Sequence, residues 1–281
     1  MQNETILVTG ATGKVGRRLT AKLQAEGRAF RAVSRSTEIP FDWHKPETWD
    51  AAFAGITAAY LIPPDEPVPA EAVVAAAVKA GVRRLVSQSG RRIEVLTAAA
   101  GVSPDEVAMH AVQNAVQASG LEWTVLQANN FNQNFDEGDN RESILAGELS
   151  LPLDNVPEPF IDVEDIAEVA AAVLTRDGHT GRVYELSGPE AVTHEDAIAI
   201  IAKATGREIA FRAATPEGFV ADLRGYGVPE PLVAFLDVMY AIMRDGALAV
   251  PADGVQEVLG REPVAFADWA ARAAAAGAWD E

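Results

Sequence analysis

The sequence has no cysteine, and it is poor in aromatic and basic residues. Without cysteine the chain has no disulfide, no thiol nucleophile and no thiolate ligand for a metal. The formal net charge of −18 disfavours contact with the phosphate backbone of a nucleic acid, because proteins that bind it usually present a basic face. Histidines are few, and His44, His179 and His194 lack the spacing with carboxylates that metal ligands show. We therefore expect neither a metal nor a nucleic-acid partner.

Long hydrophobic runs are absent too. No apolar segment is long enough to span a membrane, and no charged and apolar leader precedes the first predicted strand. These features predict a cytoplasmic protein without a membrane partner. A chain of 281 residues can bury a large core, as one two-lobed domain or as two smaller domains.

A glycine-rich turn stands close to the N-terminus. The apolar run at residues 5–9 leads into Gly10-x-x-Gly13-x-x-Gly16, and a helical pattern follows. A strand, a turn and a helix N-terminus together bind anions, because unpaired N–H groups and the helix dipole point at the turn. We predict a dinucleotide site, in which Gly10 permits the turn, Gly13 admits a pyrophosphate and Gly16 lets the helix pack closely. The alternative is an ordinary β-turn-α unit with packing glycines. The same predicted site includes Thr12, Lys14 and Val15.

The end of the second predicted strand indicates which dinucleotide is bound. Strand 30–34 ends at Ser34-Arg35-Ser36, where an NAD site usually carries an acidic residue for the ribose hydroxyls. A guanidinium flanked by hydroxyls suits a 2′-phosphate instead, since that group takes charge-assisted hydrogen bonds. We therefore predict NADP(H) as the cofactor. The alternative is that Arg35 is a solvated surface charge. Asp42 can accept the adenine amino group, or it can serve a turn or a helix cap.

Strands and helices alternate through the first half of the chain. The fourth, fifth and sixth strands are predicted at residues 57–62, 84–89 and 122–127, and helices at 14–25, 69–80 and 104–118. Strands that alternate with helices of about 10–15 residues imply a parallel, doubly wound α/β sheet.

The rhythm changes after residue 128. An amide-rich and aromatic segment follows, then a helix at 163–174, a strand at 182–186, and from residue 208 a short strand with three or four helices. This part is predicted to pack over the carboxyl edge of the sheet, where ligands bind. We predict a dinucleotide-binding domain of residues 1–128 and 158–187, and a smaller, mostly helical substrate lobe of residues 129–157 and 188–281.

Several segments together resemble the NmrA-like branch of the atypical short-chain dehydrogenases/reductases, over nearly the whole chain. Residues 9–16 resemble that family's cofactor turn, and Ser34-Arg35-Ser36 resembles the end of its second strand. Its later signatures are matched at residues 81–87, 118–126 and 160–167. Residues 131–135, 184–189 and 253–261 are similar to ergot-alkaloid-type reductases and their bacterial relatives.

The resemblance implies a Rossmann fold, an NADP(H) cofactor and hydride transfer to a small substrate. Related members include quinone, isoflavone and triphenylmethane reductases and some natural-product ketoreductases. The family also contains dinucleotide sensors that bind a protein partner and catalyse nothing, so the fold alone does not settle the function. A sensor of that kind is the alternative to a reductase.

A feature common in short-chain dehydrogenases is missing, because no tyrosine here has a lysine four residues later. Hydride delivery to a carbonyl or imine needs a proton source and a group that holds developing charge. His110, on the corresponding helix, is the best candidate acid because imidazole titrates near neutral pH, although it can equally be a structural histidine. Ser87 and Ser89 lie where the resemblance places the catalytic serine, and each can bond a substrate oxygen or cap the strand end.

The nicotinamide is expected along the ends of successive strands, next to Ile62, Pro63, Ser87, Gln88, Asn129, Asn130 and Phe131. Asp162 and Asp165 form a tempting carboxylate pair, but negative charge at a helix N-terminus explains them better. Together these observations predict a monomeric or homodimeric reductase. It would transfer hydride from NADPH to a C=O, C=N or C=C group of a small aromatic or polycyclic substrate.

Overall fold

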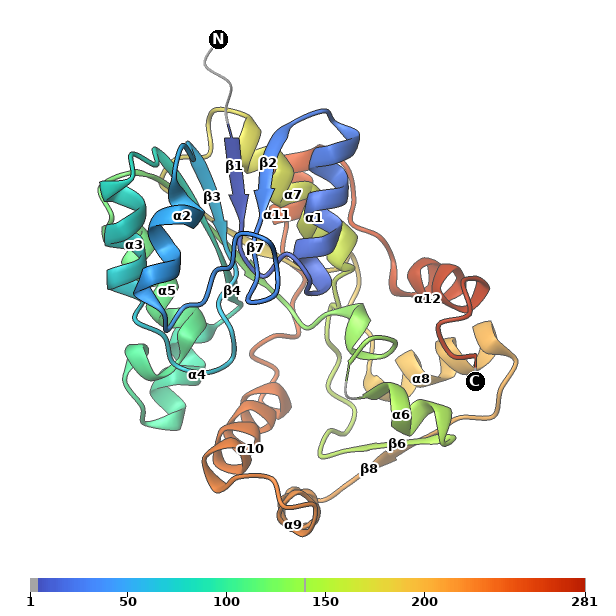
Figure 1. The fold of residues 1–281 in the computed structure, drawn as a ribbon. Coiled ribbons are helices and arrows are strands. Elements are labelled where there is room, and N and C mark those ends of the chain that lie inside the picture. The colour runs from blue at the N-terminus through green and yellow to red at the C-terminus, as the bar shows by residue number, and fades with distance from the viewer. Residues whose placement is uncertain (1–4, 139, 281) are drawn as a thin grey trace.

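A six-stranded parallel sheet forms the centre of the molecule, with the strand order β2-β1-β3-β4-β5-β7 (Figure 1). The computed structural model describes residues 5–138 and 140–280. The strands are β1 (Thr5–Val8), β2 (Ala29–Ala32), β3 (Ala58–Leu61), β4 (Arg84–Gly90), β5 (Glu122–Ala128) and β7 (Arg182–Leu186). Because all pairs are parallel, the carboxyl ends of the strands meet at one edge of the sheet.

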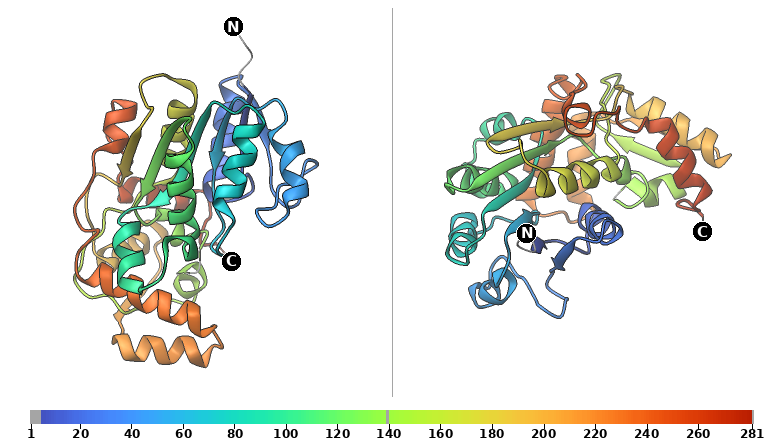
Figure 2. Two further views of the ribbon diagram at one scale, coloured as in Figure 1. Left: turned by 90° about the vertical axis from the view of Figure 1, so that its left-hand side faces the viewer. Right: turned by 90° about the horizontal axis from the view of Figure 1, so that it is seen from above.

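Helices cover both faces of this sheet (Figures 1 and 2). Ile6 and Val8 point into one apolar core, and Leu7 points into the other, as the alternation of a strand buried on both faces requires. The first core holds α1 (Lys14–Ala25), α7 (Val163–Thr175) and α11 (Gly254–Leu259). The second holds α2 (Trp49–Phe53), α3 (Ala70–Lys79) and α5 (Ala108–Ala118).

The carboxyl edge of the sheet is stepped. The last residue of β3, Leu61, pairs with Ser87 in the middle of β4. Gln88, Ser89 and Gly90 therefore extend beyond β3, and they pair only with β5 on their other side. The end of β4 therefore lies beyond the end of β3 at this edge.

A second structural part follows β5 and continues after β7. It holds a two-stranded parallel sheet and an aromatic core in which the rings of Phe135, Phe160, Phe266 and Trp269 contact one another. Its elements lie below and beside the carboxyl edge in Figure 1. They are β6 (Glu148–Leu151), β8 (Ala210–Ala213), α6 (Asn140–Leu145), α8 (His194–Thr205), α9 (Pro216–Gly225), α10 (Glu230–Arg244) and α12 (Phe266–Ala275).

The expected doubly wound fold is confirmed, but three details of the sequence-based prediction are wrong. The sequence-based numbering makes the strands at 57–62, 84–89 and 122–127 the fourth to sixth, which assumes a third strand before them. No described residue between β2 and β3 forms such a strand. The predicted helix 104–118 is broken, because Val107 is extended between a 3-10 turn (Pro104–Glu106) and α5. Helix α4 (Ile93–Ala100) was not predicted.

The division into two domains stays a prediction. Helix α11, from the range assigned to the lobe, packs on α7 and β7 of the central sheet instead. Within residues 5–138 and 140–280, no helix is long and apolar enough to cross a membrane.

Candidate active site

The glycine turn has the geometry of an anion-binding β-turn-α unit. Gly10 has a φ of +58°, which only glycine adopts readily, and the Gly13 N–H donates to the Gly10 carbonyl at 2.9 Å. Gly13 is the N-cap of α1, and no side chain caps the helix, so the first N–H groups have no side-chain acceptor. A Cβ on Gly16 would collide with the Gly10 carbonyl and lie 2.8 Å from the Cα of Ala11. Gly16 is thus the point of close packing between helix and strand.

A hollow of about 250 Å³ joins this turn to the ends of β2 and β3. It brings together predicted cofactor residues from three segments of the chain: Gly10, Thr12, Gly13, Ser34, Arg35, Asp42, Ile62 and Pro63. It is also lined by residues that sequence reasoning missed: Phe41, Trp43, His44, Pro64 and Glu66. The aromatic residues carried a signal, since the run Phe41-Asp42-Trp43-His44 directly follows the second predicted strand and its turn.

Arg35 is exposed at the rim of this hollow. It forms no hydrogen bond or ion pair with any residue in the described part of the chain. Its neighbours Ser34 and Ser36 contact each other through their hydroxyl oxygens at 3.2 Å. The guanidinium therefore remains available to a ligand, as the prediction of a 2′-phosphate site requires.

Asp42 stabilises the turn that follows it. Its Oδ1 accepts a hydrogen bond from the His44 N–H at 3.0 Å, and this bond lowers the pKa of the carboxyl. Lys45 Nζ lies 3.5 Å from Oδ2. The turn role anticipated as an alternative is therefore present, while contact with an adenine stays a prediction.

The other residues assigned to the turn lie behind the hollow. Val15 on α1 is buried in the apolar core. Ser36 is exposed and does not line the hollow. Lys14 Nζ donates to Asn134 Oδ1 at 3.1 Å, which ties the start of α1 to the segment after β5. Arg18 strengthens the same connection through ion pairs with Glu137 and Glu164.

Strand alternation separates the polar side chains of β4. Gln88 Oε1 accepts a hydrogen bond from the Tyr60 hydroxyl at 3.1 Å, on the α1–α7 face of the sheet. Ser87 and Ser89 therefore point to the opposite face, which α5 covers. Both serine hydroxyls are buried and have no hydrogen-bond partner among the described residues. Contact with a substrate oxygen stays a prediction.

His110 lies on α5 and is held by α4. Its Nδ1 is 2.9 Å from Thr97 Oγ1, and that hydroxyl donates its own hydrogen to the Ile93 carbonyl at 2.7 Å. Thr97 must then accept from Nδ1–H, which places the lone pair of the neutral ring on Nε2. In this tautomer His110 has no second proton to donate.

Amide side chains follow β5, as predicted. Asn129 Oδ1 accepts from Arg91 at 3.1 Å, while its Nδ2 is buried without a partner. Asn130 Nδ2 donates to Glu158 Oε2 at 2.8 Å. Phe131 is half-buried and forms an isolated bridge with Ile161. None of these residues lines the hollow of the glycine turn, so their place beside a nicotinamide stays a prediction.

Arg91 is the residue that sequence reasoning missed most clearly. Its side chain is only 4 % exposed, and it donates to Glu185 on β7 at 2.9 Å and to the Val250 carbonyl at 3.1 Å. We call Arg91, Asn129 and Glu185 the Arg91 cluster. No sequence signal indicates this cluster, because the residues that bond to Arg91 are far from it in the chain. Asn129, Glu185 and Val250 lie 38, 94 and 159 positions away.

Asp162 and Asp165 serve the start of α7, in agreement with their interpretation as helix N-terminal charges. Asp162 is the N-cap, accepts from the Glu164 N–H and pairs with Arg272 at 2.6 Å. Asp165 pairs with Arg261 at 2.7 Å. Burial raises the pKa of Asp165. Among residues 5–138 and 140–280, no group of histidines and carboxylates is arranged to hold a metal ion.

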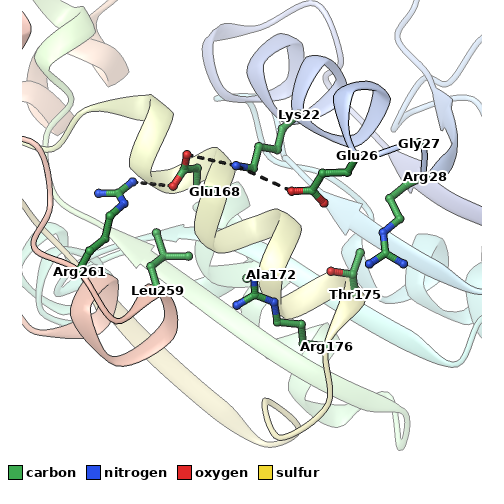
Figure 3. A pocket seen from close by; sticks show the side chains of 10 residues that line it. All are labelled: Lys22, Glu26, Gly27, Arg28, Glu168, Ala172, Thr175, Arg176, Leu259 and Arg261. Carbon is green, nitrogen blue, oxygen red and sulfur yellow. Dashed lines mark hydrogen bonds and ion pairs between the residues drawn. The ribbon is translucent and has the colours of Figure 1, made fainter.

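A larger hollow lies on the opposite side of the molecule, at the C-terminal ends of α1 and α7 (Figure 3). Four of its charged lining residues are ion-paired, since Lys22 pairs with Glu26 and Glu168 bridges Lys22 at 3.2 Å and Arg261 at 2.6 Å. It is remote from the carboxyl edge because both helices run away from that edge. It therefore takes no part in the candidate site.

A sequence model of the NmrA-like family matches residues 2–266. The chain belongs to this family. It is 32% identical to the NAD(P)H azoreductase of Xenophilus azovorans, over 97% of this chain and 99% of the relative. It is 33% identical to the (4-alkanoyl-5-oxo-2,5-dihydrofuran-3-yl)methyl phosphate reductase of Streptomyces griseus, over 96% and 98%. Festuclavine synthase II of Penicillium roqueforti is 30% identical over 94% and 96%, which confirms the resemblance to ergot-alkaloid-type enzymes.

Solved structures confirm the Rossmann fold. The NADPH-dependent quinone oxidoreductase of Escherichia coli in complex with NADPH superposes with a TM-score of 0.78 at 22% identity, over 95% of this chain and 99% of that one. The triphenylmethane reductase of Citrobacter sp. in complex with NADP(H) gives a TM-score of 0.76 at 22% identity, over 96% and 99%. The family and the fold are thus established together, and several relatives that match nearly the whole chain are named reductases.

Proposed function

We propose that this protein is an NADP(H)-dependent reductase that transfers hydride to a C=O, C=N or C=C group of a small aromatic or polycyclic substrate. The observation that carries the proposal is the hollow at the glycine turn. It gathers Gly10 and Gly13, the unpartnered Arg35 and the strand end at Pro63 around one space. A mononucleotide with a 2′-phosphate needs these groups in this arrangement.

The residues have separate tasks in binding. N–H groups at the start of α1 would hold the pyrophosphate, and Arg35 with Ser34 and Ser36 would hold the 2′-phosphate. Asp42 would accept the adenine amino group. NADPH, when bound, supplies the hydride. The step where β4 extends beyond β3 would position the nicotinamide between Pro63 and Ser89.

The substrate would approach from the second structural part. Ser87 and Ser89 have unpartnered hydroxyls on the α5 face and can hydrogen-bond a substrate oxygen. Named reductases among the relatives support the reaction class, and two of them, an azoreductase and a reductase of a dihydrofuran phosphate, are named for conjugated acceptors. Aromatic side chains of α9 and α10 suit a flat substrate. Phe219 and Tyr240 are an example, with ring centroids 5.1 Å apart.

Equilibrium titration with NADPH and NADH, followed by turnover, tests the proposal. We expect tighter binding of NADPH than of NADH, and NADPH oxidation with at least one member of a panel of quinones, azo compounds, imines and polycyclic ketones. Binding without turnover on the whole panel would support the dinucleotide-sensor alternative, which the missing Tyr-x-x-x-Lys pattern favours. Failure to bind either nucleotide would refute both.

A further inference from the structure

A buried carboxyl group lies beyond the carboxyl edge of the sheet, next to the Arg91 cluster. Glu158 is 1 % exposed, and its backbone is fixed by reciprocal hydrogen bonds with Val192 at 2.8 and 3.0 Å. Its Oε2 accepts from Asn130 Nδ2 at 2.8 Å. Its Oε1 is buried without any hydrogen-bond partner, and the carboxyl forms no ion pair with a described residue. One oxygen is therefore held in place, and the other has no partner among the described residues.

The position of Glu158 is between the two structural parts. Asn130, which holds Oε2, directly follows Asn129 at the end of β5. The same Asn130 Nδ2 also donates to Met243 Sδ of α10 at 3.9 Å. Glu158 is thus next to both the strand ends expected to hold a nicotinamide and the helix expected to cover a substrate.

The surroundings of Glu158 raise the pKa of its carboxyl toward neutral pH. Burial raises the pKa of its carboxyl to about 7, against the opposing effects of the Asn130 hydrogen bond and of the charge on Arg91. Arg91 is itself paired with Glu185 of β7, and α10 contributes the uncharged Met243. A general acid works best when its pKa lies near the working pH.

The other candidate acids are less suited to this task. The Nδ1 proton of His110 is bound by Thr97, so its free Nε2 accepts rather than donates in the neutral ring. Ser87 and Ser89 have hydroxyl protons of very low acidity, and neither hydroxyl is hydrogen-bonded to a base among the described residues. A protonated carboxyl is a far stronger acid than a serine hydroxyl, and unlike the neutral His110 ring it carries a proton that no neighbouring side chain binds.

We propose that Glu158 is the proton donor of the reduction, through its free Oε1, with Asn130 holding the carboxylate that results. This inference rests on the proposed function. Hydride from NADPH forms the new C–H bond, and the π electrons of C=X form the X–H bond with the proton of Glu158. The products are the reduced substrate, NADP⁺ and the Glu158 carboxylate, which regains its proton from water.

Paired acceptors separate proton donation from a structural role. A ketone or quinone needs a proton after it takes hydride, whereas a cationic triarylmethane dye or an iminium ion becomes neutral and needs none. Glu158→Gln keeps the size of the side chain and the acceptor for Asn130, but it has no acidic proton. We expect this variant to lose about 10²–10³-fold in kcat on the proton-requiring acceptor. We expect kcat on the cationic acceptor and the Kd of NADPH to change by less than about threefold.

The pH profile and two further variants complete the test. Wild-type kcat on the proton-requiring acceptor should fall above pH about 7, and this limb should vanish in Glu158→Gln. Glu158→Asp, which retains an acid, should be more active than Glu158→Gln, and it serves as the test if the Gln variant does not fold. Glu190→Gln, an exposed carboxyl two residues from Val192, should behave as wild type.

Three outcomes would overturn the proposal in distinguishable ways. Equal losses on both kinds of acceptor would make Glu158 a structural residue. An unchanged rate and pH profile in Glu158→Gln would place the donor elsewhere. A wild-type protein that reduces no acceptor would refute the proposed function itself, and the proton donor with it.

Discussion

The two ends of the carboxyl edge are built on different principles. At the glycine turn, an exposed hollow is shaped by backbone geometry, and Arg35 has no partner among the described residues. At the Arg91 cluster, a guanidinium that is 4 % exposed is surrounded by partners from distant segments. The first end is open, and we propose that it receives an anion. The second is a closed polar network in which Arg91, just after β4, holds Asn129 after β5 and Glu185 on β7.

This difference shows why one end could be anticipated and the other could not. A turn is specified by residues that are neighbours in the sequence, so its glycines can be recognised there. A buried polar network is specified by which strands lie side by side, and its members have no common sequence pattern. The following experiments test the contrast, from the largest expected effect to the smallest.

Replacement of Gly16 by alanine should have the largest effect. The added Cβ would meet the Gly10 carbonyl and the Ala11 backbone, neither of which can move away as a side chain can. We expect a loss of about 3 kcal/mol in the free energy of unfolding and no measurable NADPH binding. Gly13→Ala is the matched control, because its Cβ would be 3.3 Å from the Gly10 carbonyl oxygen, and it should lose only about 1 kcal/mol. Urea denaturation measures both, and equal losses would contradict the packing role of Gly16.

The stability of the second end should depend on pH through Glu158. Its pKa is about 7 in the folded chain, against an ordinary value of 4.5. Between these values the folded chain binds a proton that the unfolded chain has released, so stability falls as the pH rises from about 4.5 to about 7. The free energy of unfolding should therefore fall by about 3 kcal/mol more in wild type than in Glu158→Gln between pH 5 and pH 8. Urea denaturation at these two pH values measures the difference.

Other groups titrate as well, so the pH dependence of stability must be compared between wild type and Glu158→Gln. Burial also raises the pKa of Asp136 to about 6 and lowers that of His194 to about 4. Both contributions are present in wild type and variant and cancel when the variant is subtracted. An identical pH dependence in the two proteins would show that Glu158 is ionised throughout the range.

Arg35→Ala tests the open end of the edge. Loss of the charge-assisted hydrogen bonds to a 2′-phosphate should weaken NADPH binding by roughly 30-fold, which corresponds to about 2 kcal/mol. NADH affinity should not change, since NADH lacks that phosphate. Arg28→Ala, at the remote hollow of Figure 3, is the control and should leave both affinities as they are. A similar loss for both nucleotides would assign Arg35 to general electrostatic attraction.

Glu185→Gln should have the smallest effect, although it breaks a pair with a buried arginine. The Glu185 side chain is 37 % exposed, so water screens the interaction, and Arg91 retains its bonds to Asn129 and the Val250 carbonyl. We expect a loss of about 1 kcal/mol in urea denaturation. A loss above about 3 kcal/mol would indicate that the pair behaves as fully buried.

The accuracy of the sequence-based predictions follows the same division. The strand–turn–helix unit at Gly10 and the strand at 182–186 are short-range patterns, and the structure contains both. The third strand was assumed from the numbering of a regular doubly wound sheet, and the loop that replaces it supplies Phe41, Trp43 and His44 to the hollow. The break at Val107 could not be seen, because a single extended residue leaves the helical pattern on either side unchanged.

The sequence by itself determined the family, the parallel sheet and the cofactor end of the site, because apolar periodicity and glycine spacing are local properties of the chain. Only the tertiary structure decided which nitrogen of His110 is free, that Ser87 and Ser89 point away from Gln88, and that Glu158 is buried with one unpartnered oxygen. These properties depend on strand register and on burial by segments far away in the sequence. A carboxyl group has its ordinary acidity in the unfolded chain, and the fold changes that acidity when it removes the surrounding water.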